Sequence, residues 1–322
     1  MHRLVLMTNV LIVICTILSA TVNGFAAKRR VVPQKKSRTK KKVLSLESLL
    51  ELEIELHEKG YTYVIGSDDS GGAGCIAGPV VVASCCILQP YYDTFLPISS
   101  STIQSKSEVL VSQSEMDILS KVNECKQTSV QPEVQVSQSE MDILSKVNDC
   151  KQLTATQRQD IYETIQSYPE IFAISISQRT VEEIDQVNIN RAQMLAFAES
   201  IENLVEQHDL PFDRVYSIVD GKKSPKLYAS QRIQSNDGEE GLKVFKCRPY
   251  VNGDSNVYCV ALASIIARVV RDEAMQKLDE QYPLYKFGEH NGFGNKEHIE
   301  ILHKLGAIEG VHRMSFKQVK GR

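Results

Sequence analysis

The sequence lacks the cysteine spacing of a metal or redox motif, and its first 42 residues lack acidic side chains. None of the eight cysteines forms a C-x-x-C pair, and Cys85 and Cys86 lie in an apolar run, so we expect buried thiols of a reducing compartment rather than a disulfide framework. Residues 1–42 hold ten of the 37 Lys and Arg residues, which leaves 27 basic against 40 acidic residues, a net charge of −13. A body of this charge has no general attraction to phosphates.

The N-terminal apolar run is too short for the ~20 residues of a membrane span. It extends from Leu4 to Ile17 behind the basic Arg3 and ahead of small residues, which indicates a signal peptide over residues 1–24. Residues 25–42 start at Phe25 and contain nine basic residues. This two-part arrangement resembles the plastid address of algae with secondary plastids. We therefore expect a cleaved plastid-targeting segment and no membrane in the mature form, with secretion or a nucleic-acid-binding tail as alternatives.

Beyond this segment, β-branched runs alternate with amphipathic ones, which indicates a single α/β domain over residues 43–322. The expected strands are 61–66, 80–88, 171–178, 214–219 and 243–250, and the expected helices are 44–58, 153–165, 181–206 and 257–280, followed by a last helix in the tail. Residues 228–242 are polar, so we expect a loop there.

A near-perfect duplication interrupts this alternation. The segment from Val111 to Gln127 returns 25 residues later, from Val136 to Gln152. Two copies are too few for a solenoid. We interpret residues 98–135 as an inserted loop, and we expect the second copy, which leads directly into an amphipathic segment, to be the working one.

Acidic residues follow the predicted strands in a pattern that suggests a metal site. Asp68 and Asp69 follow one strand, Asp220 follows another, and Asp254 precedes the long helix. A single acid in such a place most often caps a turn or helix, and Asp254 alone would suit a cap. Several carboxylates close together repel one another unless a cation neutralises them, and their oxygens suit Mg²⁺ or Mn²⁺. Two such ions can clamp both oxygens of a phosphodiester displacement.

Six quoted stretches together resemble ribonuclease HII, the type 2 ribonuclease H family. "GSDDSGGAGCIAGPVVVA" is similar to the opening motif of the family, and "NDCKQLT" to its Asp-Ser-Lys segment. "IVDG" is similar to its third acidic strand, and "VNGDSNVYCVALASIIARVVRD" to its Gly-Asp-Ala stretch and following helix. "HNGFGNKEH" and "VHRMSF" are similar to its C-terminal motifs. The motifs run in order from about residue 60 to 320.

The resemblance implies a ribonuclease H-like fold, with a mixed central sheet flanked by helices and a helical C-terminal extension. It implies a monomeric endonuclease that binds RNA–DNA hybrids or DNA containing ribonucleotides. Such an enzyme cuts 5′ to ribonucleotides, leaves a 3′-hydroxyl and a 5′-phosphate, and removes RNA primers or misincorporated ribonucleotides. The implied catalytic ligands of two Mg²⁺ or Mn²⁺ ions are Asp68, Asp69, Asp220 and Asp254. The implied substrate-binding residues are Gly71, Gly72, Ala73, Gly74, Lys151 and Phe293.

Three departures from the family pattern fall within these motifs. The second acid is Asp69 where the family has Glu, and the turn from Gly71 to Gly74 is one residue longer than Gly-Arg-Gly and has no arginine. Phe293 replaces a tyrosine, so a hydroxyl that can hydrogen-bond is lost. These losses leave open the alternative of a catalytically silent hybrid-binding protein.

Other polar residues near the motifs are expected to be structural. Asp272 lies deep in the long helix, where we expect a salt bridge or a surface position. His290 and His298 flank a glycine-rich turn, and we expect them to be structural or adjacent to substrate rather than metal ligands.

Overall fold

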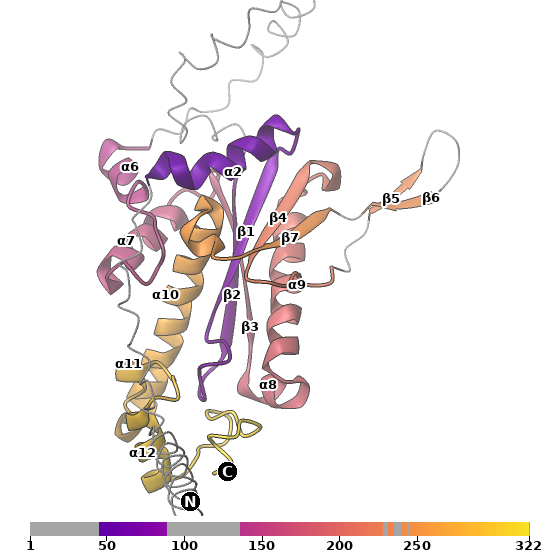
Figure 1. Cartoon of the computed structure of the whole chain (residues 1–322). Helices are drawn as coiled ribbons and strands as arrows, with labels where there is room; N and C mark the ends of the chain where they lie inside the picture. The colour runs from indigo at the N-terminus through magenta and orange to yellow at the C-terminus, as the bar shows by residue number, and fades with distance from the viewer. Residues whose placement is uncertain (1–44, 89–135, 228–230, 235–239, 244, 322) are drawn as a thin grey trace, which may run out of the picture. The chain divides into compact units, whose positions relative to one another are not determined.

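The computed structural model describes residues 45–88, 136–227, 231–234, 240–243 and 245–321 (Figure 1). Residues 43–322 form one compact unit. The N-terminal address segment and the first copy of the duplication lie outside the described residues, so the expectations about both stay predictions. In the described part of the chain, no helix is long and apolar enough to cross a membrane.

A five-stranded mixed sheet forms the centre of the unit, with the strand order β3-β2-β1-β4-β7. Its strands are β1 (Tyr63–Ser70), β2 (Val80–Ile87), β3 (Phe172–Arg179), β4 (Val215–Asp220) and β7 (Lys246–Tyr250). The β1–β2 and β2–β3 pairs are antiparallel, whereas β1–β4 and β4–β7 are parallel. The predicted mixed sheet is therefore confirmed.

The polar stretch predicted as a loop contains a separate hairpin. Strands β5 (Gln231–Gln234) and β6 (Glu240–Lys243) pair only with each other, and β7 begins at Lys246 rather than at residue 243. A two-stranded ribbon is held by backbone hydrogen bonds, and its sequence need not show the apolar alternation of a half-buried strand. Hydrophobic pattern alone therefore missed it.

Helices cover both faces of the sheet. They are α2 (Leu46–Glu58), α6 (Gln138–Leu144), α7 (Ala155–Gln166), α8 (Val181–Val187), α9 (Ile189–Gln207), α10 (Tyr258–Gln281), α11 (Phe287–His290) and α12 (Lys296–Leu305). Alternate residues of β2 point to opposite faces, so Cys85 packs in the cluster around α10 and Cys86 in the cluster around α9. Figure 1 shows α10 and α9 on either side of the strands.

The single helix predicted for residues 181–206 is broken in two. Asn188 has a φ of 69°, which interrupts the helix between α8 and α9. Its side chain then caps α9 by accepting a hydrogen bond from the backbone of Arg191 at 3.1 Å. Asparagine tolerates positive φ and is a strong helix cap, so one residue ends the first helix and starts the second.

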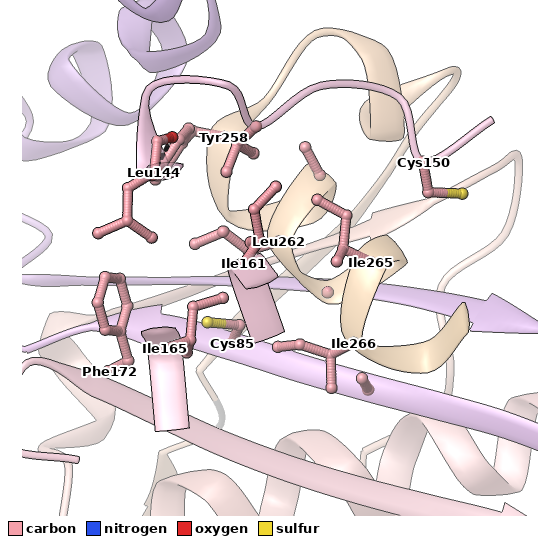
Figure 2. Close-up of a cluster of buried hydrophobic side chains, with 14 of the residues drawn as sticks. Cys85, Leu144, Cys150, Ile161, Ile165, Phe172, Tyr258, Leu262, Ile265 and Ile266 are labelled. Atoms are coloured by element: carbon pink, nitrogen blue, oxygen red, sulfur yellow. Dashed lines mark hydrogen bonds between the residues drawn. The ribbon is translucent and has the colours of Figure 1, made fainter. Parts of the chain in front are cut away.

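The core beside α10 also contains the second copy of the duplication. Leu144 of α6 packs with Ile161 and Ile165 of α7 and with Tyr258 and Leu262 of α10 (Figure 2). The Tyr258 hydroxyl donates a hydrogen bond to the Leu144 carbonyl at 3.2 Å. This copy is therefore part of the folded core, as expected of the working one.

Candidate active site

Two neighbouring strands bring two predicted acids together. The prediction that Asp68 and Asp69 follow their strand is wrong, because β1 continues through both to Ser70. In the parallel β1–β4 pair, Ser67 lies opposite Val219, so the next residues are Asp68 and Asp220. Asp254 joins them from a single turn of 3-10 helix, Gly253–Ser255, in which the backbone N–H of Gly253 donates to Asp220 Oδ1 at 2.7 Å.

Asp254 does not cap the long helix. The N-cap of α10 is Val257, which makes no side-chain capping bond. The Asp254 carboxylate instead accepts from the Lys151 ammonium, with Nζ and Oδ2 2.7 Å apart, and from the Ser255 hydroxyl at 3.1 Å. The predicted substrate-binding lysine of the second copy therefore contacts a predicted metal ligand.

Asp68 and Asp69 are consecutive on β1, so their side chains leave opposite faces of the sheet. Asp68 is buried and accepts from the backbone N–H of Asp69 at 2.7 Å. Asp69 accepts instead from the side-chain amide of Gln193 on α9, with Nε2 and Oδ2 3.0 Å apart. The two neighbouring acids therefore have different hydrogen-bond partners.

Burial and mutual repulsion disfavour ionisation of these carboxyls. Burial, followed by the charges of Asp69 and Asp220, raises the pKa of Asp68 well above its usual value. Burial also raises the pKa of Asp69, although the Gln193 hydrogen bond opposes it. The pKa of Asp220 is raised by burial and by the charge of Asp254. A nearby cation would relieve all three, because it stabilises the ionised forms.

Carboxylate oxygens suit a hard divalent cation, but in this structure they accept hydrogen bonds from other groups. Among the described residues, no three His, Cys, Asp or Glu side chains are arranged as a ready-made ion site. The carboxylates instead bind Gln193, the Gly253 N–H and Lys151. An ion would have to replace such donors, and the Lys151 ammonium is the one positive charge among these three.

The predicted substrate-binding turn lies against Phe293. The backbone N–H of Gly294 donates to the Gly74 carbonyl at 3.1 Å, and the backbones of Cys75 and Phe293 form an isolated antiparallel β-bridge. A Cβ on Gly74 would lie 3.5 Å from the Phe293 ring, which is 43% exposed. Gly71 has a φ of +92°, and a Cβ there would meet the Arg271 side chain at 2.1 Å, so only glycine fits.

Two buried arginines that sequence reasoning passed over hold this turn in place. Arg313 donates to the carbonyls of Gly71, Gly72, Cys75, Gly78 and Pro79. Arg271 donates to the carbonyls of Ala77, Pro79 and Asn291, and the last of these lies in the segment that carries Phe293. Both side chains are fully buried. The signal that could have revealed Arg271 is a charged residue on the apolar side of α10.

The remaining polar predictions are structural. His290 and His298 are buried and stacked with ring centroids 4.0 Å apart, and His298 Nε2 lies 3.3 Å from His312 Nε2. Asp272 forms salt bridges with Arg268 at 2.9 Å and Arg158 at 3.5 Å. The structural reading of the histidines and the salt bridge of Asp272 are therefore both confirmed.

Comparison with known proteins decides the family. Residues 129–319 match the family model described as ribonuclease HII. A ribonuclease HII of Caldicellulosiruptor bescii is 31% identical over 270 residues, 84% of this chain and 94% of the relative. This chain belongs to the ribonuclease HII family. Membership makes it an enzyme of the ribonuclease H type.

Further comparisons agree in sequence and in fold. A ribonuclease HII of Fusobacterium nucleatum is 30% identical over 272 residues, 84% of this chain and 93% of the relative. A crystal structure of a mutant Bst-RNase HIII matches with a TM-score of 0.50 at 17% identity, over 82% of this chain and 70% of that chain, which supports the fold alone. A stretch of 270 residues in a 322-residue chain must include residues 53–270, so the sequence similarity extends over all four predicted acids.

Proposed function

We propose that this member of the ribonuclease HII family is a metal-dependent endonuclease that cuts the RNA strand of RNA–DNA hybrids. Cleavage would occur 5′ to ribonucleotides and leave a 3′-hydroxyl and a 5′-phosphate, which suits removal of RNA primers or misincorporated ribonucleotides from DNA. The observation that carries the proposal is the closeness of Asp68 and Asp220 on the paired strands β1 and β4, with Asp254 beside Asp220.

Four carboxylates would hold the metal: Asp68, Asp69, Asp220 and Asp254. Bound Mg²⁺ or Mn²⁺ supplies an activated water and stabilises charge on the phosphodiester. The chain itself supplies the positioning. Lys151 offers a positive charge next to Asp254, and the ring of Phe293 and the backbone of the glycine turn form a surface for the substrate strand.

The alternative that the sequence left open was a catalytically silent hybrid-binding protein. Phe293 in place of tyrosine and the missing arginine of the turn favour it. The retention of all four acids favours the enzyme, because a protein that only bound hybrids would not need a carboxyl such as Asp68, whose pKa is raised by burial and by neighbouring acids.

Asp68→Asn tests the enzyme directly. The substitution removes one ligand charge but keeps the shape, and loss of several kcal/mol of metal stabilisation corresponds to about a thousandfold fall in kcat. Cleavage of labelled hybrids, with Mg²⁺ and Mn²⁺ compared, gives the measurement. Asp160→Asn is the matched control, since Asp160 is exposed on α7, and it should stay close to the unmodified chain. Activity of the Asp68 variant within tenfold of that chain would mean that the metal is held elsewhere.

A further inference from the structure

Asp149 is a buried acid in the second copy of the duplication that the proposed chemistry does not use. Its side chain is 2% exposed. Oδ1 accepts from the backbone N–H of Lys151 at 3.0 Å, and Oδ2 accepts from the Ser255 hydroxyl at 3.3 Å. Its carbonyl accepts from the N–H of Gln152 at 2.8 Å. One carboxylate therefore links the turn that carries Lys151 to the turn that carries Asp254.

The position of Lys151 depends on such a link. Its side chain is 71% exposed, and the ammonium lies 2.7 Å from Asp254 and 3.8 Å from Asp149. A long, exposed side chain is not held by packing along its length, so its reach is set by its backbone and by the charges at its tip. Moving the turn by a fraction of the side chain's length would move the ammonium away from Asp254.

The chain itself contains a comparison for this acid. The two 17-residue copies are identical except at one position, where the first has Glu124 and the second has Asp149. An aspartate oxygen can accept from the backbone two residues on, as Asp149 does. A glutamate is one methylene longer, so its oxygens lie farther from that N–H. At a site that is 2% exposed, the extra methylene also has no free volume to enter.

We propose that Asp149 is a positioning residue that fixes Lys151 beside Asp254, and that it makes the second copy the functional one. The inference deepens the proposed function and rests on it for its effect on cleavage. Asp149 acts through Lys151 and Ser255, not through contact with substrate.

The duplication allows a matched pair of variants. Deleting residues 111–135 or residues 128–152 gives two chains of equal length that join the same flanking sequences and differ only by Asp or Glu at this position. We expect the Asp chain to cut hybrids like the full-length protein. We expect the Glu chain to lose about tenfold to a hundredfold in kcat/KM, because small misplacements of positioned groups cost rates of this order. Asp149→Glu in the full chain should show the same loss, whereas Asp142→Glu, on an exposed face of the same copy, should not.

Two readouts separate positioning from a merely structural role. In a Lys151→Ala background, Asp149→Glu should cause little further loss, whereas a structural defect would add to it. Acetylation of the Lys151 amine, followed by mass spectrometry, should be faster in the Glu chain, because the ammonium is released from Asp254. Equal labelling and equal cleavage in the matched pair would overturn the inference. If the full-length chain does not cut hybrids, the proposed function fails, and the labelling rates alone decide the role of Asp149.

Discussion

Arg313 offers a severe test of how the glycine turn is built. Its guanidinium makes six hydrogen bonds to five carbonyls between Gly71 and Pro79, and its side chain is fully buried. Burial lowers the pKa of Arg313 to about 10, so it remains charged at neutral pH. Arg313→Met keeps a long apolar stem but removes every donor.

The cost follows from the carbonyls left behind. The Pro79 carbonyl keeps its bond from Arg271, and the Gly72 carbonyl keeps its bond from the Cys75 N–H, so the loss falls on the carbonyls of Gly71, Cys75 and Gly78. A buried acceptor without a partner costs about 1–3 kcal/mol, or about 3–9 kcal/mol for three of them. Water will reach some of these carbonyls, and methionine avoids the several kcal/mol needed to bury a cation. We therefore expect a net loss of about 3–5 kcal/mol in the free energy of unfolding, the lower part of the cost of three unpaired carbonyls.

Urea unfolding at 25 °C measures this loss, with Arg191→Met on the exposed face of α9 as the control. Arg313→Lys should recover little, because an ammonium cannot reproduce the planar fork that serves several carbonyls at once. Cleavage by the fraction that stays folded should also fall, since the turn would lose its shape. A loss below about 1 kcal/mol for Arg313→Met would show that solvent or relaxation replaces the guanidinium, and the reasoning would be wrong.

Two further predictions concern specificity and pH. Phe293→Tyr should shift cleavage toward isolated ribonucleotides relative to RNA tracts by up to about tenfold, because a hydrogen bond from the regained hydroxyl is worth roughly 0.5–1.5 kcal/mol. The ratio of the two cleavage rates is measured on duplexes that carry either one ribonucleotide or an RNA tract. An unchanged ratio would contradict the prediction. Burial lowers the pKa of both His298 and His312 from 6.5 to about 4, so between these pH values the unfolded chain binds more protons than the folded chain. Stability from these rings should be present above pH 6.5 and lost as the pH falls toward 4, by up to roughly 3 kcal/mol each. Proton NMR of the imidazole rings should show neither titrating above pH 5.5, and a midpoint near 6.5 for either ring would contradict this.

The parts of the fold that sequence could predict are those fixed by apolar pattern. The β-branched runs of β1, β2 and β4 become strands, and the parallel pairing of β1 with β4 places Asp68 next to Asp220, which ends β4. The directions of the acidic side chains were harder to predict from the sequence. That Asp68 and Asp69 leave opposite faces follows from strand geometry only once the strand is known to continue through both residues to Ser70.

Most of the features that the sequence did not predict are contacts to backbone groups. Every residue has a carbonyl, so no sequence pattern marks the five that Arg313 binds or the three that Arg271 binds. The break at Asn188 is similar, because the apolar spacing of α8 and α9 runs through it and the helix ends by a backbone angle. The role of Asp149 does not follow from its Asp-Ser-Lys segment for a similar reason, since its partners include a backbone N–H and the hydroxyl of the distant Ser255.

These arginines also bear on how an acidic protein could bind a phosphate chain. In a planar peptide, the carbonyl of one residue and the N–H of the next point in opposite directions. Arg313 binds the carbonyls of Gly71 and Gly72, so the N–H groups of Gly72 and Ala73 point away from the guanidinium. The turn thus directs these donors away from a buried positive charge, and Gly74 of the same turn lies beside the Phe293 ring. Because charges farther than about 10 Å are largely screened at ordinary salt, this local arrangement counts for more at the turn than the net charge of −13 on residues 43–322.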